Sequence, residues 1–168
     1  MICDFLSERS LSLHREYLKK LKLQYSILEK SVPCIVGKGL WDIQKMRVPY
    51  KEEILSLKCN ITCHELFFDS FGAGNQTSKC IKQTFGSEAV FLYKIYEASK
   101  TVENCFAFVS MSRGIPRFFF GSPGMILKLL NPVLVIDLYE HAYFLDYGFD
   151  KEDYIRRLLP YLNLNKVL

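Results

Sequence analysis

The chain has 168 residues, of which 49% are hydrophobic and 14% aromatic. This composition permits one substantial hydrophobic core and excludes disordered and fibrous classes of protein. The net charge is only +4, an excess that is typical of solvated helix faces, and no compact recognition motif indicates nucleic-acid binding. The basic residues that stand out lie towards the two ends of the chain: Arg15, Lys19, Lys20, Lys22, Arg156 and Arg157.

The cysteines and the start of the chain indicate a reducing compartment. The segment MICDFLSERS carries two acidic residues and does not resemble a secretory signal. The longest apolar runs fall short of the roughly 20 residues that span a bilayer. We therefore expect reduced thiols and a location in the cytoplasm or the mitochondrial matrix. Six cysteines fit no regular disulfide framework: Cys3, Cys34, Cys59, Cys63, Cys80 and Cys105.

Two long helices are expected in the first half of the chain. Residues 7–30 are predicted to form a helix capped by Ser7, because apolar residues recur there at intervals of three and four. A proline and two glycines then break the pattern, which predicts a loop up to Pro49. The second helix is expected over residues 50–71. Each helix carries one histidine on its apolar stripe.

The pattern changes from helical to β-prone in the second half. Residues 78–100 predict one or two helices, divided near Gly86. Short aromatic segments separated by glycine and proline follow. They predict a small antiparallel sheet of about three strands, at residues 106–112, 116–122 and 132–138.

Beyond the last strand, EHAYFLDYG is expected to turn the chain away from the sheet. A final helix is predicted over residues 150–163, kinked or divided by Pro160. Helices followed by a small antiparallel sheet with flanking helices make an α+β fold. We place a boundary at residue 80, between the helical first half and the second half that contains the sheet.

Three histidines and one aspartate form the candidate site. His14 and His64 lie on the two long helices, and His141 follows Asp137 by four residues, just beyond a strand. Three imidazoles and a carboxylate suit iron, manganese or zinc. A single histidine on an apolar face is more often a satisfied core residue, so the spacing alone leaves both interpretations open.

The stretch DLYEHAYFLDY, residues 137–147, resembles the signature D-x-W-E-H-A-Y-Y-x-D-Y of the iron/manganese superoxide dismutases. The similarity continues without a gap through GFDKEDYIRRLLPYLNLNKV. ICDFLSERSLSLH is similar to the family's opening helix, CHELFFDSF to its N-H-x-x-F-Y-W segment, and FGSEAVF to its F-G-S-x-x-x-F segment. Residues 30–50 and 110–130 match poorly.

The resemblance implies one iron or manganese ion per chain and superoxide as the substrate. It also implies an N-terminal helical hairpin, residues 1–80, packed on a C-terminal α/β metal-binding domain, residues 81–168, which agrees with the order of elements. A homodimer, or a heterodimer with a related chain, is implied as well, with Glu140 and Tyr143 supporting the ligands and bridging the subunits. The implied metal ligands are His14, His64, Asp137 and His141.

Two alignments of the first helix stay open. With His14 as the first ligand, Lys22 stands where the family has its gateway tyrosine. In the other alignment Tyr17 is that tyrosine, but Arg9 then occupies the ligand position, and a protonated guanidinium cannot ligate a metal. The first alignment is favoured because ICDFLSERSLSLH fits without gaps, and a short deletion would satisfy both.

Other departures concern the surroundings of the metal. Asn60 stands where iron-type members have a glutamine that bonds the metal's solvent ligand. Tyr139 replaces a tryptophan and Phe144 a tyrosine of the signature, and NCFAFV replaces a tryptophan-rich segment. The catalytic candidates beside the metal are therefore Tyr17 and Asn60.

Three functions are consistent with these residues. The first is an active superoxide dismutase. The second is a non-catalytic subunit with the same fold in a larger assembly such as a mitochondrial ribosome. In that case the six basic residues named above would contact RNA or ribosomal proteins. The third is a zinc site that uses Cys59, Cys63 and His64, or a degenerate site without metal.

Overall fold

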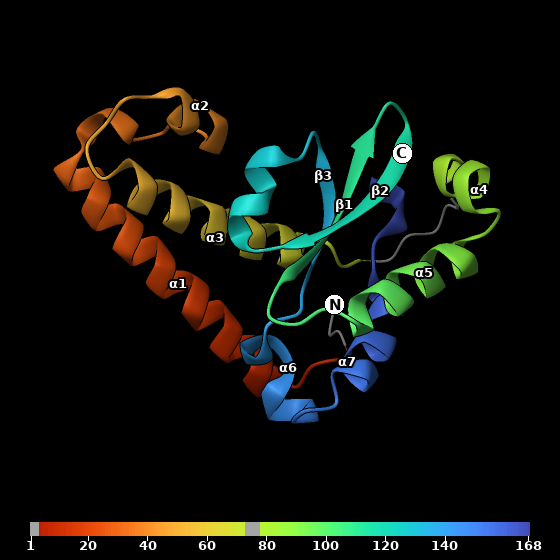
Figure 1. The fold of residues 1–168 in the computed structure, drawn as a ribbon. Helices are drawn as coiled ribbons and strands as arrows, with labels where there is room; N and C mark the ends of the chain where they lie inside the picture. Colours follow the sequence, from red (N-terminus) through yellow and green to blue (C-terminus); the bar gives the residue numbers. More distant parts are fainter. Residues whose placement is uncertain (1–3, 73–77) are drawn as a thin grey trace.

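A computed structural model describes residues 4–72 and 78–168 and confirms the α+β fold (Figure 1). Helices come first, and a three-stranded antiparallel sheet in the order β2-β1-β3 follows with helices after it. The division into two domains at residue 80 stays a prediction. The elements are α1 (Glu8–Ser31), α2 (Leu40–Lys45), α3 (Lys51–Asp69), α4 (Lys79–Phe85), α5 (Glu88–Lys100), β1 (Phe106–Ser112), β2 (Ile115–Gly121), β3 (Pro132–Asp137), α6 (Glu140–Tyr147) and α7 (Lys151–Leu158).

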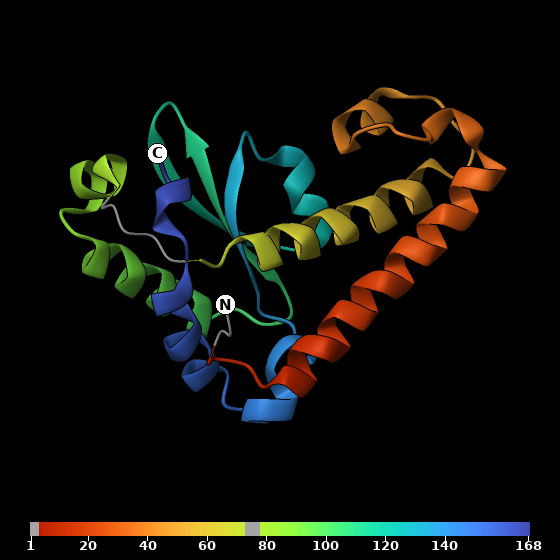
Figure 2. The same ribbon diagram turned by 180° about the vertical axis from the view of Figure 1, so that it is seen from behind.

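Helices α1 and α3 form the predicted N-terminal hairpin (Figures 1 and 2). The Ser7 hydroxyl accepts a hydrogen bond from the Ser10 backbone at 3.2 Å, so the predicted cap is confirmed. Leu21 and Tyr25 of α1 pack with Ile54 and other residues of α3 in a small core of their own. Each helix also buries its histidine, which places both imidazoles on the inner face of the hairpin.

The predicted loop before Pro49 was wrong in part, because it contains the short helix α2. The Asp42 carboxylate accepts a hydrogen bond from the Gly39 backbone at 3.2 Å and so caps this helix. Leu40 and Ile43, three residues apart, are almost completely buried. Two apolar residues are too few to reveal a helical period in the sequence, and the helix is stabilised by tertiary burial.

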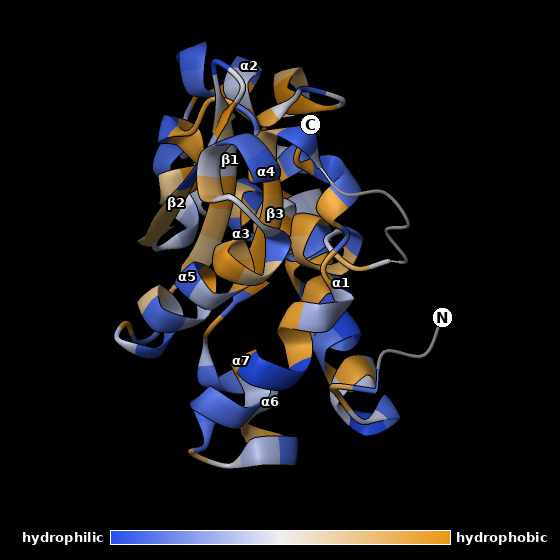
Figure 3. Cartoon of the chain, turned by 90° about the vertical axis from the view of Figure 1, so that its right-hand side faces the viewer, coloured by the Kyte–Doolittle hydropathy of each residue, from blue (hydrophilic) through white to orange (hydrophobic). Residues whose placement is uncertain are grey.

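Strand β1 is the centre of the sheet and is buried along almost its whole length. It pairs antiparallel with β2 and with β3, and Phe106 at its start lies opposite Asp137 at the end of β3. Helix α3 packs against β3. In Figure 3 the hydrophobic colour gathers on the sheet and on adjacent helices, whereas α6 and α7 carry many hydrophilic residues. The end of β3 therefore lies beside the buried face of α3.

The segment after β3 does more than turn the chain, because residues 140–147 form helix α6, which packs against α1 and α7. Helix α7 ends at Leu158, and Pro160 lies in a 3₁₀ turn that follows, so the proline ends this helix. Among the described helices, none combines the length and the apolar character that a membrane span requires.

Ser70 joins the hairpin to the sheet. Its side chain is fully buried, donates a hydrogen bond to the Leu66 carbonyl at 2.6 Å and accepts one from the Val135 backbone at 2.7 Å. Because β3 is an edge strand, this hydroxyl satisfies a backbone amide that the sheet leaves unpaired.

Ser70→Ala is expected to lower the free energy of unfolding by about 1–3 kcal/mol, because it leaves the buried Val135 amide without an acceptor. Chemical denaturation of metal-free protein measures this change. The matched control is Ser31→Ala, which removes an exposed hydroxyl bonded to the Ile27 carbonyl of its own helix. Its effect should stay within about 0.5 kcal/mol, and an equal loss in both variants would contradict the linking role of Ser70.

Candidate metal centre

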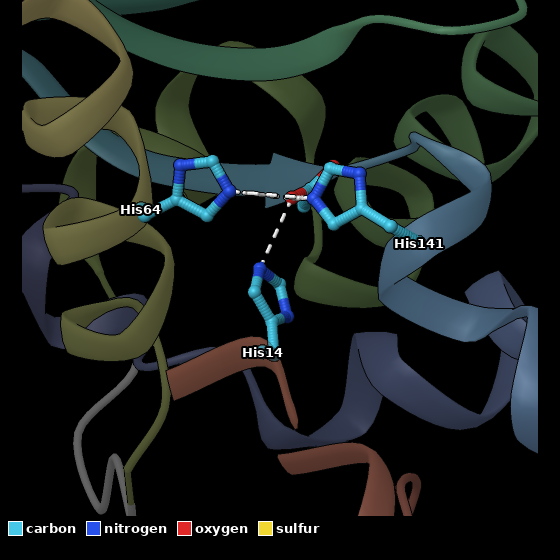
Figure 4. A group of neighbouring side chains, drawn as sticks. His14, His64 and His141 are labelled. Atoms are coloured by element: carbon cyan, nitrogen blue, oxygen red, sulfur yellow. Dashed lines mark hydrogen bonds and ion pairs between the residues drawn. The ribbon is translucent and has the colours of Figure 1, made fainter. Parts of the chain in front are cut away.

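Four side chains from four elements meet at one point. His14 comes from α1, His64 from α3, Asp137 from the end of β3 and His141 from the first turn of α6 (Figure 4). The Nε2 atoms of the three rings lie 3.2, 3.5 and 3.1 Å, in that order, from Oδ2 of Asp137. One possible ligand atom from each residue lies within 4.8 Å of the others. The group has the donor set that the sequence indicated.

The backbone around Asp137 fixes its carboxylate. Its Oδ1 accepts a hydrogen bond from the Tyr139 backbone at 3.0 Å, and its own carbonyl accepts one from the buried Tyr154 hydroxyl at 2.9 Å. Oδ1 is thus used in the turn between β3 and α6. Oδ2 is left to face the three imidazoles.

The tautomer of His64 follows from its partner. Its Nδ1 lies 2.8 Å from the Asn60 carbonyl oxygen one turn earlier in α3. A carbonyl only accepts, so Nδ1 carries the proton and Nε2 presents a lone pair to the group. A bond of this kind at the outer nitrogen is what orients a histidine ligand and raises its basicity.

The centre of the group lacks hydrogen bonds that its burial calls for. Both ring nitrogens of His14 and Oδ2 of Asp137 are buried and have no partner with hydrogen-bond geometry among the described residues. The Nε2 atoms of His64 and His141 face each other at 3.3 Å. Buried, unpaired acceptors are costly. A cation that binds these nitrogen and oxygen atoms would offset that cost, so the residues fit a transition metal ion.

The electrostatics favour the unprotonated form of two ligands. Burial raises the pKa of Asp137, but His14 and His141 beside it outweigh burial, and its pKa lies well below the ordinary value. Burial lowers the pKa of His64, although the Asp137 charge opposes this shift. An ionised carboxylate and a neutral imidazole are the forms that bind metal.

The structure places at the group both the ligand of one alignment of the first helix, His14, and the tyrosine of the other, Tyr17. His14 is in the group, whereas Arg9 is exposed at the surface. Three residues after His14, the Tyr17 ring lies with its centroid 5.2 Å from that of His64 and 5.1 Å from that of His141. Lys22 points elsewhere and forms an ion pair with Glu65 at 2.7 Å. Of the two positions proposed for the gateway residue, Tyr17 lies beside the group and Lys22 does not.

The remaining candidates lie at different distances from the group. Asn60 contacts His64 through its backbone carbonyl. Glu140 is exposed on α6, and Tyr143 is buried and stacks on Tyr154 at 5.0 Å between ring centroids. Both line an open cavity of about 770 Å³ between the end of α5 and helices α6 and α7. Their sequence-based role as a dimer bridge stays a prediction.

The six basic residues divide between two helices. Arg15 lies over the Phe68 ring at 5.7 Å, and Lys19 and Lys20 are exposed on α1, as is Lys22 in its pair with Glu65. On α7, Arg156 and Arg157 both form ion pairs with Asp153. A role for them in binding RNA or a protein partner stays a prediction.

Cys59 and Cys63 are buried on α3, and neither belongs to the metal-ligand group found among the described residues. The Cys63 thiol donates a hydrogen bond to the Pro123 carbonyl at 3.7 Å. Burial raises the pKa of Cys59 to about 11. His64 directs Nε2 to Asp137 and not towards these thiols, which gives no support to a zinc site made with the two cysteines.

Sequence reasoning missed two aromatic residues that support the site. Phe106 lies edge-on to His64, with 5.4 Å between ring centroids, and Tyr154 anchors the backbone of Asp137. Phe106 stands within NCFAFV, which had suggested only the loss of tryptophans. The pairing of Phe106 with Asp137 across β1 and β3 is the signal that locates it, but that register is not readable from one strand alone.

The lowered pKa of His64 predicts a loss of stability in acid for the metal-free protein. The unfolded chain protonates this ring near pH 6.5, and the folded chain does so only at a lower pH. The His64 ring therefore costs no stability above pH 6.5. Below that pH the free energy of unfolding decreases as the pH falls towards the folded pKa of His64, by up to about 1.4 kcal/mol per pH unit.

His64→Gln should flatten the dependence of the unfolding free energy on pH below 6.5, measured by urea denaturation at several pH values. Cys59→Ala is the control, because the pKa of this thiol is far above the range. Equal slopes in wild type and His64→Gln would show that His64 does not titrate in this way.

Two comparisons with known proteins bear on the family of this chain. Residues 73–168, more than half of the chain, match the family described as iron/manganese superoxide dismutases, C-terminal domain. A superoxide dismutase [Mn] of Acinetobacter baylyi (strain ATCC 33305 / BD413 / ADP1) is 27% identical over 169 residues, which cover 92% of this chain and 72% of that protein. The chain belongs to the iron/manganese superoxide dismutase family.

Proposed function

We propose that this protein catalyses the dismutation of superoxide to dioxygen and hydrogen peroxide with one iron or manganese ion per chain. The observation that carries the proposal is the meeting of three Nε2 atoms at one buried carboxylate oxygen, where His14 Nε2 and Asp137 Oδ2 have no hydrogen-bond partner among the described residues. A group arranged only for stability would satisfy these atoms with hydrogen bonds.

The proposed ligands are His14, His64, Asp137 and His141. They would hold a redox-active ion, which would supply one-electron chemistry: one superoxide would be oxidised to dioxygen, and a second, with two protons, would be reduced to hydrogen peroxide. The ionised Asp137 supplies one negative charge to the site, and the turn that binds its Oδ1 keeps Oδ2 in place. His64 keeps its proton on Nδ1, where the N–H donates a hydrogen bond to the Asn60 carbonyl. These contacts hold the ligands before an ion arrives.

The substrate would approach from the side of His141. The His141 side chain is 40% exposed, whereas the side chains of His14, His64 and Asp137 are at most 1% exposed. Tyr17 lies at the same opening, 38% exposed and against both His64 and His141. We assign its hydroxyl to proton delivery, and Asn60 is the second candidate for this task. Lys19 and Arg15 on the same helix would attract the superoxide anion.

We further propose that two copies associate through the surface of α6. Glu140 is exposed beside the ligand His141, and Phe144 and Phe149 expose 45% and 84% of their surface close by. Exposed aromatic residues that gather on one surface mark interaction sites. Glu140 would then reach a ligand histidine of the second copy.

Protein purified from cells grown with iron and manganese is expected to hold close to one of these ions per chain and to dismutate superoxide. His64→Ala should abolish both, because it removes a ligand. Elemental analysis and a dismutation assay on the same sample measure them. Cys59→Ala, which truncates a buried residue of the same helix outside the group, should keep both.

Two results would contradict the proposal. Wild-type protein that holds metal but does not dismutate superoxide would make the site a relic. Protein without iron or manganese that co-purifies with a large particle would favour the non-catalytic subunit.

Tyr17→Phe should keep the metal but lower kcat by roughly 100-fold or more, because a positioned proton donor contributes about 100- to 10,000-fold. Stopped-flow kinetics at several pH values measures this. Tyr93→Phe removes a hydroxyl from a tyrosine that is 60% exposed on α5 and is the control. Unchanged kcat in Tyr17→Phe would move the proton-delivery role to another group.

A further inference from the structure

Five aromatic rings make a closed circuit around the outer side of the site. Neighbouring ring centroids lie 5.4 Å apart from Phe106 to His64, 5.2 Å from His64 to Tyr17 and 5.1 Å from Tyr17 to His141. The circuit closes at 5.7 Å from His141 to Tyr139 and 5.3 Å from Tyr139 to Phe106. All five separations are in the range in which aromatic rings attract each other.

Of the two histidines in this circuit, His141 has the fewer other restraints. His141 is 40% exposed at its side chain, whereas His64 is buried and fixed by the bond between its Nδ1 and the Asn60 carbonyl. The hydrogen bonds among the described residues include none from Nδ1 of His141. The side-chain torsion that turns an imidazole has a broad energy minimum, so an exposed ring needs packing to define its direction.

We propose that Tyr139 is a positioning residue that holds the His141 ring against Tyr17 and so keeps this ligand directed at the metal. The inference rests on the proposed function of the site. Tyr139 stacks on His141 with 23° between the ring planes, and Tyr17 closes on it at 47°. Between them the imidazole keeps Nε2 3.1 Å from Oδ2 of Asp137.

Two contacts hold Tyr139 itself in place. Its backbone N–H donates to Oδ1 of Asp137 at 3.0 Å, which couples the stacked ring to a second ligand. Its ring meets the fully buried Phe106 at 63°, and Phe106 in turn meets His64 at 82°. Phe106, a buried residue of β1, therefore contacts His64 directly and supports the exposed His141 through Tyr139.

The test measures how fast manganese leaves the protein. Wild type, Tyr139→Phe and Tyr139→Leu are loaded with Mn²⁺ and mixed with an excess of chelator. Tyr139→Leu removes the ring and should release the ion roughly 10-fold faster, the size of effect seen when a residue that orients a metal ligand is lost. Tyr139→Phe keeps the ring and should stay within about twofold of wild type. Tyr96→Leu, a half-buried tyrosine on α5, is the control.

A second readout separates positioning from general destabilisation. The Mn²⁺ electron paramagnetic resonance spectrum should change in Tyr139→Leu and be restored in Tyr139→Phe, because it reports the ligand geometry. If Tyr139→Leu does not fold, Tyr139→Met serves as the ring-free variant. Release at the wild-type rate from the ring-free variant would overturn the proposal, and so would equally fast release from Tyr139→Phe, which would implicate the hydroxyl.

The outcomes also distinguish this proposal from the proposed function. Wild-type protein that binds no Mn²⁺ would overturn both. Bound Mn²⁺ with faster release from Tyr139→Leu, but no dismutation in wild type, would support the positioning role and reject the enzyme. Dismutation in wild type with unchanged release from Tyr139→Leu would leave the enzyme and reject the positioning role.

Discussion

The structure depends on one electrostatic constraint, the approach of three imidazole nitrogens to a single buried carboxylate oxygen. Oδ2 of Asp137 lies 3.1 to 3.5 Å from all three Nε2 atoms and has no hydrogen-bond partner among the described residues. Polar atoms that face each other without partners destabilise a fold unless a cation binds between them. The atoms whose burial without partners costs free energy are thus the same atoms that a metal ion would bind.

The fold brings these atoms together from distant parts of the chain. The hairpin of α1 and α3 supplies two ligands, and the turn from β3 into α6 supplies the other two within five residues. Ser70 joins α3 to β3, and the Tyr154 hydroxyl of α7 joins the last helix to Asp137. The first contact links the two pairs of ligands and the second supports Asp137, so the helical hairpin and the sheet are both parts of the site.

Much of this was readable from the sequence because its signals are local. The helical period, the Ser7 cap and the short β-prone segments predicted α1, α3 and the three strands, and the Asp137-to-His141 spacing drew attention to the turn. The short helix α2 was missed because its formation depends on burying Leu40 and Ile43. The place of Tyr17 beside His141, and of Phe106 beside His64, depends on packing between elements, which no local pattern encodes.

The central claim is that the four side chains bind one redox-active ion. Anomalous diffraction from crystals of the purified protein, recorded on both sides of the iron and manganese absorption edges, tests it most directly. We expect a single anomalous peak within bonding distance of Nε2 of His14, His64 and His141 and of Oδ2 of Asp137. A peak at another place, or a refined site in which the four atoms are hydrogen-bonded to one another without an ion, would contradict it.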